Sequence, residues 1–173
     1  MQTQHVQTMD DLFHALLQDL YFAEKEQLKL LPKLAQKSAN ETLKLAFRDH
    51  EDETSEQVGR LEQVFEIMGK DARGKTSDAM LAIIAEAQRA IDEIDDAAVR
   101  DAALVAAAQA AEHYEIARYA TLLGWAEHLG EDEIVELLSE TLEEERHAGE
   151  LLSSIAEGGI NATASERPEA AEA

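Results

Sequence analysis

The fold is decided by residues 137–151, which read LLSETLEEERHAGEL. Residues three, four and seven positions apart share one face of a helix, so Leu137 and Leu151 lie on the same side. Glu144 and His147 occupy the middle of that side. Because leucines flank it, we expect this face to point into a core. Buried ionisable groups are costly unless other groups compensate them, so the remainder of the chain should supply the compensation.

The composition predicts one all-α domain. The 173 residues are 45% hydrophobic and 30% charged, with only two prolines. The formal net charge of −22 argues against nucleic acid and anionic membrane surfaces as partners and favours cations. The absence of cysteine excludes disulfides and thiolate metal sites. Without a secretory signal or an apolar run that could span a membrane, we expect a cytoplasmic protein.

Hydrophobic periodicity and helix-stop signals predict five helices, at about residues 9–38, 40–68, 78–95, 97–129 and 131–157. The four long helices form two hairpins, and the short third helix lies in the connection between them. This arrangement is the ferritin-like antiparallel four-helix bundle with one long crossover. We expect a flexible N-terminus at 1–8, the bundle at 9–157, and a disordered acidic tail at 158–173.

Each long helix places ionisable side chains on its inner face, at about the same height. Glu24 is the clearest case, because leucines stand four and seven residues away on both sides. The candidates for a metal site are Glu24, His50, Glu53, Glu112, Glu115, Glu144 and His147.

No lysine or arginine falls within this predicted layer. The nearest on an inner face is Arg60, roughly 10 Å from Glu53 along the helix. Five bare carboxylates would repel one another, whereas two divalent cations would neutralise most of their charge. Carboxylate and imidazole ligands suit iron, manganese or zinc.

Taken singly, the candidates have ordinary explanations. His50 and His147 each could be packed or boundary histidines, and Glu112-x-x-Glu115 is common on a solvated helix face. Tyr21 lies one turn from Glu24 and could hydrogen-bond to it. The agreement of four helix faces at one level favours the metal site.

With these residues in place, the sequence resembles the YciF-type ferritin-like family of bacterial stress proteins. The resemblance rests on DLYFAEKEQLKLLPKL (19–34), HEDETSEQVGRLEQVFEIMG (50–69), AAEHYEIARYATLLGWAEHLG (110–130) and LLSETLEEERHAGELL (137–152). It implies a rubrerythrin-like bundle with a dinuclear metal site, a link to stress response, and often a homodimer.

The resemblance also implies a ligand set. The positions that match the core glutamates of ferritin-like di-iron proteins are Glu24, Glu53, Glu112 and Glu144. Glu115 resembles the additional glutamate of rubrerythrins, and Glu144-x-x-His147 matches the Glu-x-x-His of the last helix.

The second helix departs from the family pattern, because it reads His50-x-x-Glu53 and Glu53-x-x-Glu56 where Glu-x-x-His is expected. Whether His50 or Glu56 completes that half of the site stays open at this point.

The leading functional hypothesis is a carboxylate protein with two iron ions, or manganese or zinc, that reacts with peroxide or oxygen in a ferroxidase- or peroxidase-like way. Glu53 and Glu144 would bridge the metals, and no catalytic residue is expected beyond the metal site. One alternative is a structural or metal-binding stress protein without turnover, in which metal stabilises the bundle. Another is a manganese-catalase-like protein that disproportionates peroxide.

Overall fold

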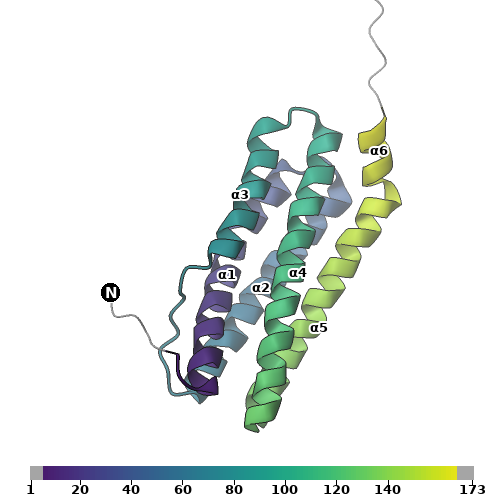
Figure 1. The fold of residues 1–173 in the computed structure, drawn as a ribbon. Coiled ribbons are helices and arrows are strands. Elements are labelled where there is room, and N and C mark those ends of the chain that lie inside the picture. Colours follow the sequence, from purple (N-terminus) through teal and green to yellow (C-terminus); the bar gives the residue numbers. More distant parts are fainter. Residues whose placement is uncertain (1–5, 167–173) are drawn as a thin grey trace, which may run out of the picture.

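The computed structural model describes residues 6–166, which are helical without a strand and form a bundle (Figure 1). The elements are α1 (Met9–Lys37), α2 (Glu41–Ile67), α3 (Asp78–Glu93), α4 (Ala97–Leu129), α5 (Asp132–Ile155), the π-helical turn η1 (Ala156–Ile160) and α6 (Asn161–Ser165). Within this described part, no helix is long and apolar enough to cross a membrane.

The four long helices pair as two hairpins, α1 with α2 and α4 with α5. Contacts of α2 with α5 and of α1 with α4 close the bundle, while α3 lies along α4 in the crossover between the hairpins. The predicted ferritin-like bundle with one long crossover is confirmed.

Local sequence signals set the helix ends. Thr8 and Asp11 form a capping box at α1, in which each side chain accepts a hydrogen bond from the other residue's backbone N–H. Asn40, Ser77 and Asp96 accept hydrogen bonds from the first turns of α2, α3 and α4. Gly130 ends α4 in the left-handed region, with φ of 75°, which favours glycine and permits the tight turn into α5.

The C-terminal boundary predicted at residue 157 is too early. Helical structure continues through η1 and α6 to Ser165, and both Ala156 and Ile160 are buried. These apolar side chains pack in the core next to Leu104 and Leu152, which keeps the chain on the bundle beyond the predicted end. The helix is nevertheless interrupted at Gly159, whose backbone is not helical (φ 158°, ψ −26°), so the chain kinks before α6. Residues 167–173 of the predicted tail, and residues 1–5 of the predicted flexible N-terminus, lie outside the described residues.

Two apolar clusters occupy the two halves of the bundle. One contains Phe13, Leu17, Leu61, Phe65, Leu122 and Leu138, and the other contains Leu31, Leu34, Leu43, Phe47, Leu104 and Leu152. On each long helix, the segment between these clusters carries most of the buried polar residues, although buried Asp101 lies near the start of α4. The polar layer predicted at mid-height is therefore present.

The inner face of α5 differs from the prediction by one residue. Leu138 and Leu152 are buried, whereas Leu137 is half-buried and Leu151 is 40% exposed. This rotation brings Glu145 into the core in place of its neighbour Glu144. The leucine doublets at 137–138 and 151–152 fit two helix faces that differ by one residue, one with Glu144 and the other with Glu145. The stretch 137–151 therefore does not decide by itself which face is buried.

Candidate metal centre

Five ionisable side chains are buried together in the polar layer: Glu24, His50, Glu112, Glu115 and Glu145. All four long helices contribute: α1 carries Glu24, α2 carries His50, α4 carries Glu112 and Glu115, and α5 carries Glu145. Each of the four carboxylates is at most 1% exposed. No lysine or arginine is among the buried residues of the described chain, so His50 is the only candidate cation inside this part of the layer.

His50 lies between two carboxylates. Its Nε2 is 3.2 Å from Oε1 of Glu112, and its Nδ1 is 3.5 Å from Oε2 of Glu53. Burial by itself would lower the pKa of His50, but the negative charge and hydrogen bond of Glu112, aided by Glu53, raise it well above its ordinary value. The raised pKa favours the imidazolium form of His50, whose positive charge would partly neutralise the layer in the metal-free protein.

Glu145 completes a candidate cluster with His50 and Glu112. One ligand atom from each of these three residues lies within 4.8 Å of the others. Burial, followed by the charges of Glu112, Glu24 and Glu115, raises the pKa of Glu145 well above its usual range. The carboxyl group is therefore unstable as an anion unless a cation joins it.

In the polar layer, four buried carboxylate oxygens lack a hydrogen-bond partner among the described residues. They are Oε2 of Glu112, Oε1 of Glu115, and both oxygens of Glu145. Buried polar atoms are normally satisfied, and each exception needs an explanation. Oxygen donors beside an imidazole suit a transition-metal ion, so the residues present fit the metal centre that the sequence predicts.

Glu24 and Glu115 are held in position by neutral side chains. The Tyr119 hydroxyl donates to Oε1 of Glu24 at 2.5 Å, and Nε2 of Gln27 donates to Oε2 of Glu115 at 3.2 Å. Burial raises the pKa of Glu24 to about 7, although the Tyr119 bond opposes the shift. Burial and the neighbouring charge of Glu24 raise the pKa of Glu115 well above its usual range.

Glu144 belongs to a different environment, which corrects its predicted inward position. The guanidinium of Arg60 donates to both its carboxylate oxygens, at 2.7 and 2.8 Å, and Gln57 donates to it at 3.2 Å. Arg60 also binds Glu140 at 3.0 Å and approaches Glu56 at 3.8 Å. We call Arg60, Glu56, Glu140 and Glu144 the Arg60 cluster.

The remaining candidates lie at the edge of the layer or outside it. Glu53 keeps 46% of its side chain exposed, and the hydrogen bond from His50 lowers its pKa. His147 is exposed, so its predicted inward position is also wrong. On α2 the structure brings His50 into the layer and leaves Glu56 in the exposed Arg60 cluster.

A cavity of about 160 Å³ between α2 and α5 reaches this layer. Its buried lining includes His50, Glu112 and Ala148, and its exposed lining includes Asp49 and His147. It therefore runs from solvent to two members of the candidate cluster, and His147 lies at its outer end.

Sequence reasoning missed Glu145, the buried amides Gln27 and Gln57, and the bond between Tyr119 and Glu24. Tyr21, whose position one turn from Glu24 would allow a hydrogen bond to it, donates instead to Glu62 at 2.7 Å. A signal for Glu145 was present, because Leu142 precedes it by three residues and Ile134 by eleven, both on its own face. The corresponding positions before Glu144 are Thr141 and the charged Glu133.

The family described as a domain of unknown function (DUF892) matches residues 8–165. The chain belongs to this family. Protein YciF of Escherichia coli (strain K12) is 44% identical over 159 residues, which cover 91% of this chain and 95% of that protein. The resemblance found in the sequence is thereby confirmed.

Solved structures of DUF892 relatives share the same bundle. The crystal structure of the E. coli stress protein YciF matches with a TM-score of 0.86 and 43% identity, covering 90% of this chain and 99% of that one. YcfI from Rhodopseudomonas palustris, for which a structural role is suggested, has a TM-score of 0.86 and 44% identity, with coverage of 89% and 98%.

A two-domain protein from Anabaena variabilis that contains a ferritin-like domain matches with a TM-score of 0.66 over 96% of this chain and 42% of that one. At 16% identity this likeness supports the fold alone.

Proposed function

We propose that this DUF892 protein binds two divalent metal ions in its buried layer, iron in the working form, and reacts there with peroxide or dioxygen. The observation that carries the proposal is the layer itself: four buried carboxylates, with four oxygens lacking partners, and only one imidazole as a candidate cation. Two divalent ions would supply the charge that the described side chains do not.

The ligands that we assign are the five buried residues Glu24, His50, Glu112, Glu115 and Glu145, with Glu53 joining from the cavity side. Glu145 takes the role that the sequence pattern suggested for Glu144. Metal ligands must be deprotonated, so binding would remove the proton from His50 and the protons that the raised pKa values keep on Glu24, Glu115 and Glu145.

Bound iron would supply one-electron exchange between its ferrous and ferric states and a place for the oxidant to bind. The chain's own residues would control the surroundings. Tyr119 and Gln27 fix Glu24 and Glu115, which limits the ways in which these carboxylates can reorient. The cavity between α2 and α5 suits metal ions, oxygen and peroxide, and its volume of about 160 Å³ is small for larger organic substrates.

A role in stress response is supported by the similarity to E. coli YciF, which is described as a stress protein. The homodimer implied by the family resemblance stays a prediction, and light scattering during size-exclusion chromatography would measure it. Neither property enters the argument for the metal site.

The test is anaerobic loading with ferrous iron, followed by rapid mixing with peroxide or oxygenated buffer. We expect a fast rise in ferric absorbance that saturates with the loaded iron, and loss of this phase in Glu145→Gln. The matched control is Glu144→Gln, which should retain the fast phase. Iron that stays ferrous, or that oxidises no faster than free iron, would refute the reaction. A manganese-loaded sample that disproportionates peroxide while the iron form does not react would favour the catalase-like alternative.

A structural role is the second candidate, since such a role is suggested for YcfI. In that case metal would raise the melting temperature by binding only the folded state, and no oxidation would follow. The same loaded sample distinguishes the two functions.

A further inference from the structure

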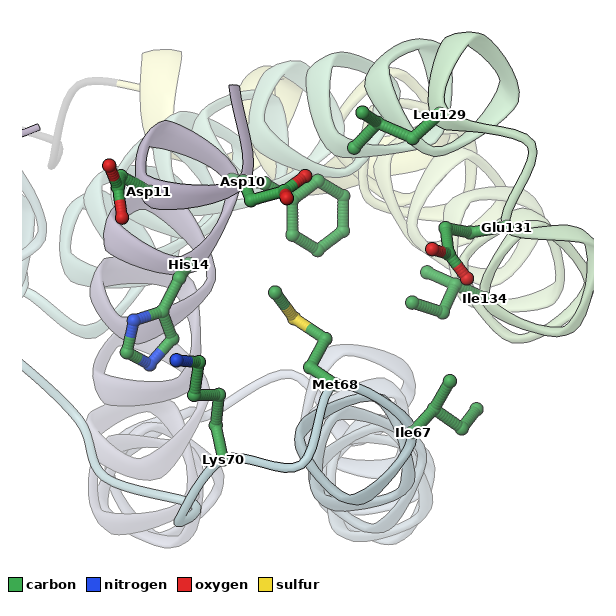
Figure 2. Close-up of a pocket in the computed structure, with 10 residues that line it drawn as sticks. Asp10, Asp11, His14, Ile67, Met68, Lys70, Leu129, Glu131 and Ile134 are labelled. Carbon is green, nitrogen blue, oxygen red and sulfur yellow. The ribbon is translucent and has the colours of Figure 1, made fainter. Parts of the chain in front are cut away.

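A second cavity, of about 380 Å³, lies at the end of the bundle where α1 begins and α2 and α4 end (Figure 2). Its lining residue Phe13 precedes Glu24 by eleven positions on α1, which corresponds to roughly 16 Å along the helix. The end cavity is therefore separate from the metal layer. Its volume is near the lower end of the range for small-molecule pockets, roughly 300–1,000 Å³.

Half of the ten residues that line the end cavity are apolar. Phe13, Ile67, Met68, Leu129 and Ile134 line it, and the Met68 side chain extends into the space in Figure 2.

Apolar exposure concentrates at this end of the described chain. Five of its nine exposed large hydrophobic residues lie here: Val6, Met9, Leu12, Ile67 and Leu129. Clustered apolar exposure marks binding sites in soluble proteins.

The opening of the end cavity is acidic. Asp10 comes from the first turn of α1 and Glu131 from the turn before α5, and Figure 2 shows both carboxylates directed toward the opening. Among residues 6–166, neither side chain has a hydrogen-bond or ion-pair partner. Two carboxylates without a partner, next to accessible apolar side chains, suit a ligand that combines a cationic group with an apolar body.

The other charged residues around the end cavity are already engaged or lie to one side. Asp11 accepts hydrogen bonds from the backbone of Gln7 and Thr8, and its carboxylate points away from the opening. Lys70 lies beside the ring of His14, on the side of the cavity away from Glu131. Two carboxylates, those of Asp10 and Glu131, are therefore available to a ligand, compared with one ammonium group, that of Lys70.

We propose that the end cavity binds a small alkylammonium compound, with its ammonium group between Asp10 and Glu131 and its alkyl chain against the accessible side chains of Ile67, Met68 and Leu129. An anionic ligand would face the acidic opening and a net charge of −22. A second copy of the chain would bring another acidic opening against the first, so self-association at this end is disfavoured.

The test follows the methionine methyl groups of the full chain by NMR while hexylammonium, hexanol or hexanoate is added at constant ionic strength. Met68 lines the cavity and is the reporter, and the buried Met80 on α3 is the internal reference. We expect saturable shifts at Met68 with little change at Met80, and hexylammonium should bind at least about tenfold more tightly than hexanol or hexanoate.

Variants that remove one or both carboxylates test whether the preference for hexylammonium depends on Asp10 and Glu131. Glu131→Gln alone should weaken hexylammonium binding, and Asp10→Asn with Glu131→Gln should bring it to the level of hexanol. The matched control is Glu93→Gln with Asp95→Asn, which removes two acidic groups at the opposite end of the bundle (Figure 1). Urea unfolding confirms that each variant is folded. Equal binding of hexanol, tighter binding of hexanoate, no saturation at Met68, or an equal loss in the control would each overturn the proposal.

Discussion

The buried layer and the Arg60 cluster both consist mainly of glutamates, and both take glutamates from α5, yet their electrostatics are opposite. In the Arg60 cluster, one guanidinium pairs with Glu140 and with both oxygens of Glu144. In the layer, Glu145 has no partner for either oxygen, and its pKa is raised by burial. The two glutamates are adjacent in sequence, and about 100° of helix rotation separates their environments.

This difference teaches how to separate a structural carboxylate from a candidate ligand. Arg60 satisfies Glu144 without any ion, whereas four oxygens of the layer have no hydrogen-bond partner within residues 6–166. The comparison can be tested by removing one member from each region.

The largest expected effect is on metal affinity. Glu145→Gln should weaken binding of Co²⁺, used as a spectroscopic substitute for Fe²⁺, by at least about 100-fold, because even outer-shell partners of a metal contribute about 10–100-fold. Glu144→Gln should change the affinity by less than about threefold, since Glu144 is already paired with Arg60. Titration calorimetry measures the Co²⁺ affinity of both variants. An equal loss of affinity in the two would contradict the distinction between Glu145 and Glu144.

The pH dependence of the metal-free protein should be the next largest effect. The pKa values of Glu24, Glu115, Glu145 and His50 are all raised in the folded state, so the folded protein binds more protons than the unfolded one above about pH 4.5. Stability is therefore full at low pH and declines as pH rises through the folded-state pKa values. For Glu24, a rise from 4.5 to about 7 corresponds to about 3 kcal/mol.

Urea unfolding of chelator-treated protein at pH 5.5 and pH 8 measures this effect. Glu24→Gln should reduce the decline, and saturating Zn²⁺ should largely abolish it by replacing the protons. Greater stability of the metal-free wild-type protein at pH 8 than at pH 5.5 would contradict the assignment of uncompensated carboxylates.

Removing the cation from the Arg60 cluster should have a smaller effect. Arg60→Gln is expected to lower the free energy of unfolding by about 1–3 kcal/mol, because Glu144 would lose two charge-assisted hydrogen bonds in a partly buried place. Metal stoichiometry should not change. Thermal unfolding and metal analysis of the same sample check both statements. A loss of metal in Arg60→Gln would contradict the separation of the Arg60 cluster from the metal site.

The smallest effect on binding equilibrium should come from the cavity between α2 and α5. Leu151 lines this cavity and is 40% exposed, so Leu151→Trp should slow Co²⁺ uptake while leaving its final affinity within about threefold. Leu151→Ala should not slow uptake, and Leu45→Trp, at an exposed position of α2 outside the cavity lining, is the matched control. Stopped-flow uptake that is equal in all variants would rule out this route.

Much of the architecture could be predicted from the sequence, because the spacing of apolar residues along a long amphipathic helix indicates which face is buried. Glu24 was clear from its leucine neighbours, and its burial between two apolar clusters agrees with that prediction. The inward positions of His50, Glu112 and Glu115 were likewise predicted correctly.

The phase of α5 could not be read from residues 137–151 alone, because the leucine doublets at both ends fit two faces one residue apart. Only the longer pattern, which includes Ile134 and Leu142, selects Glu145. Long-range partners were harder still, since nothing local indicates that Arg60 meets Glu144 or that Tyr119 meets Glu24. The end cavity was missed because it forms from residues of separate helix ends.

The most direct test of the central claim is a count of the metal ions in the buried layer. Anaerobic Fe²⁺ titration of chelator-treated protein, followed by removal of unbound iron and elemental analysis, gives the number of ions per chain. The proposed centre predicts two per chain in the wild type and in Glu144→Gln, and fewer in Glu145→Gln. A wild-type protein that retains no stoichiometric metal, or one whose metal content is unaffected by Glu145→Gln, would contradict it.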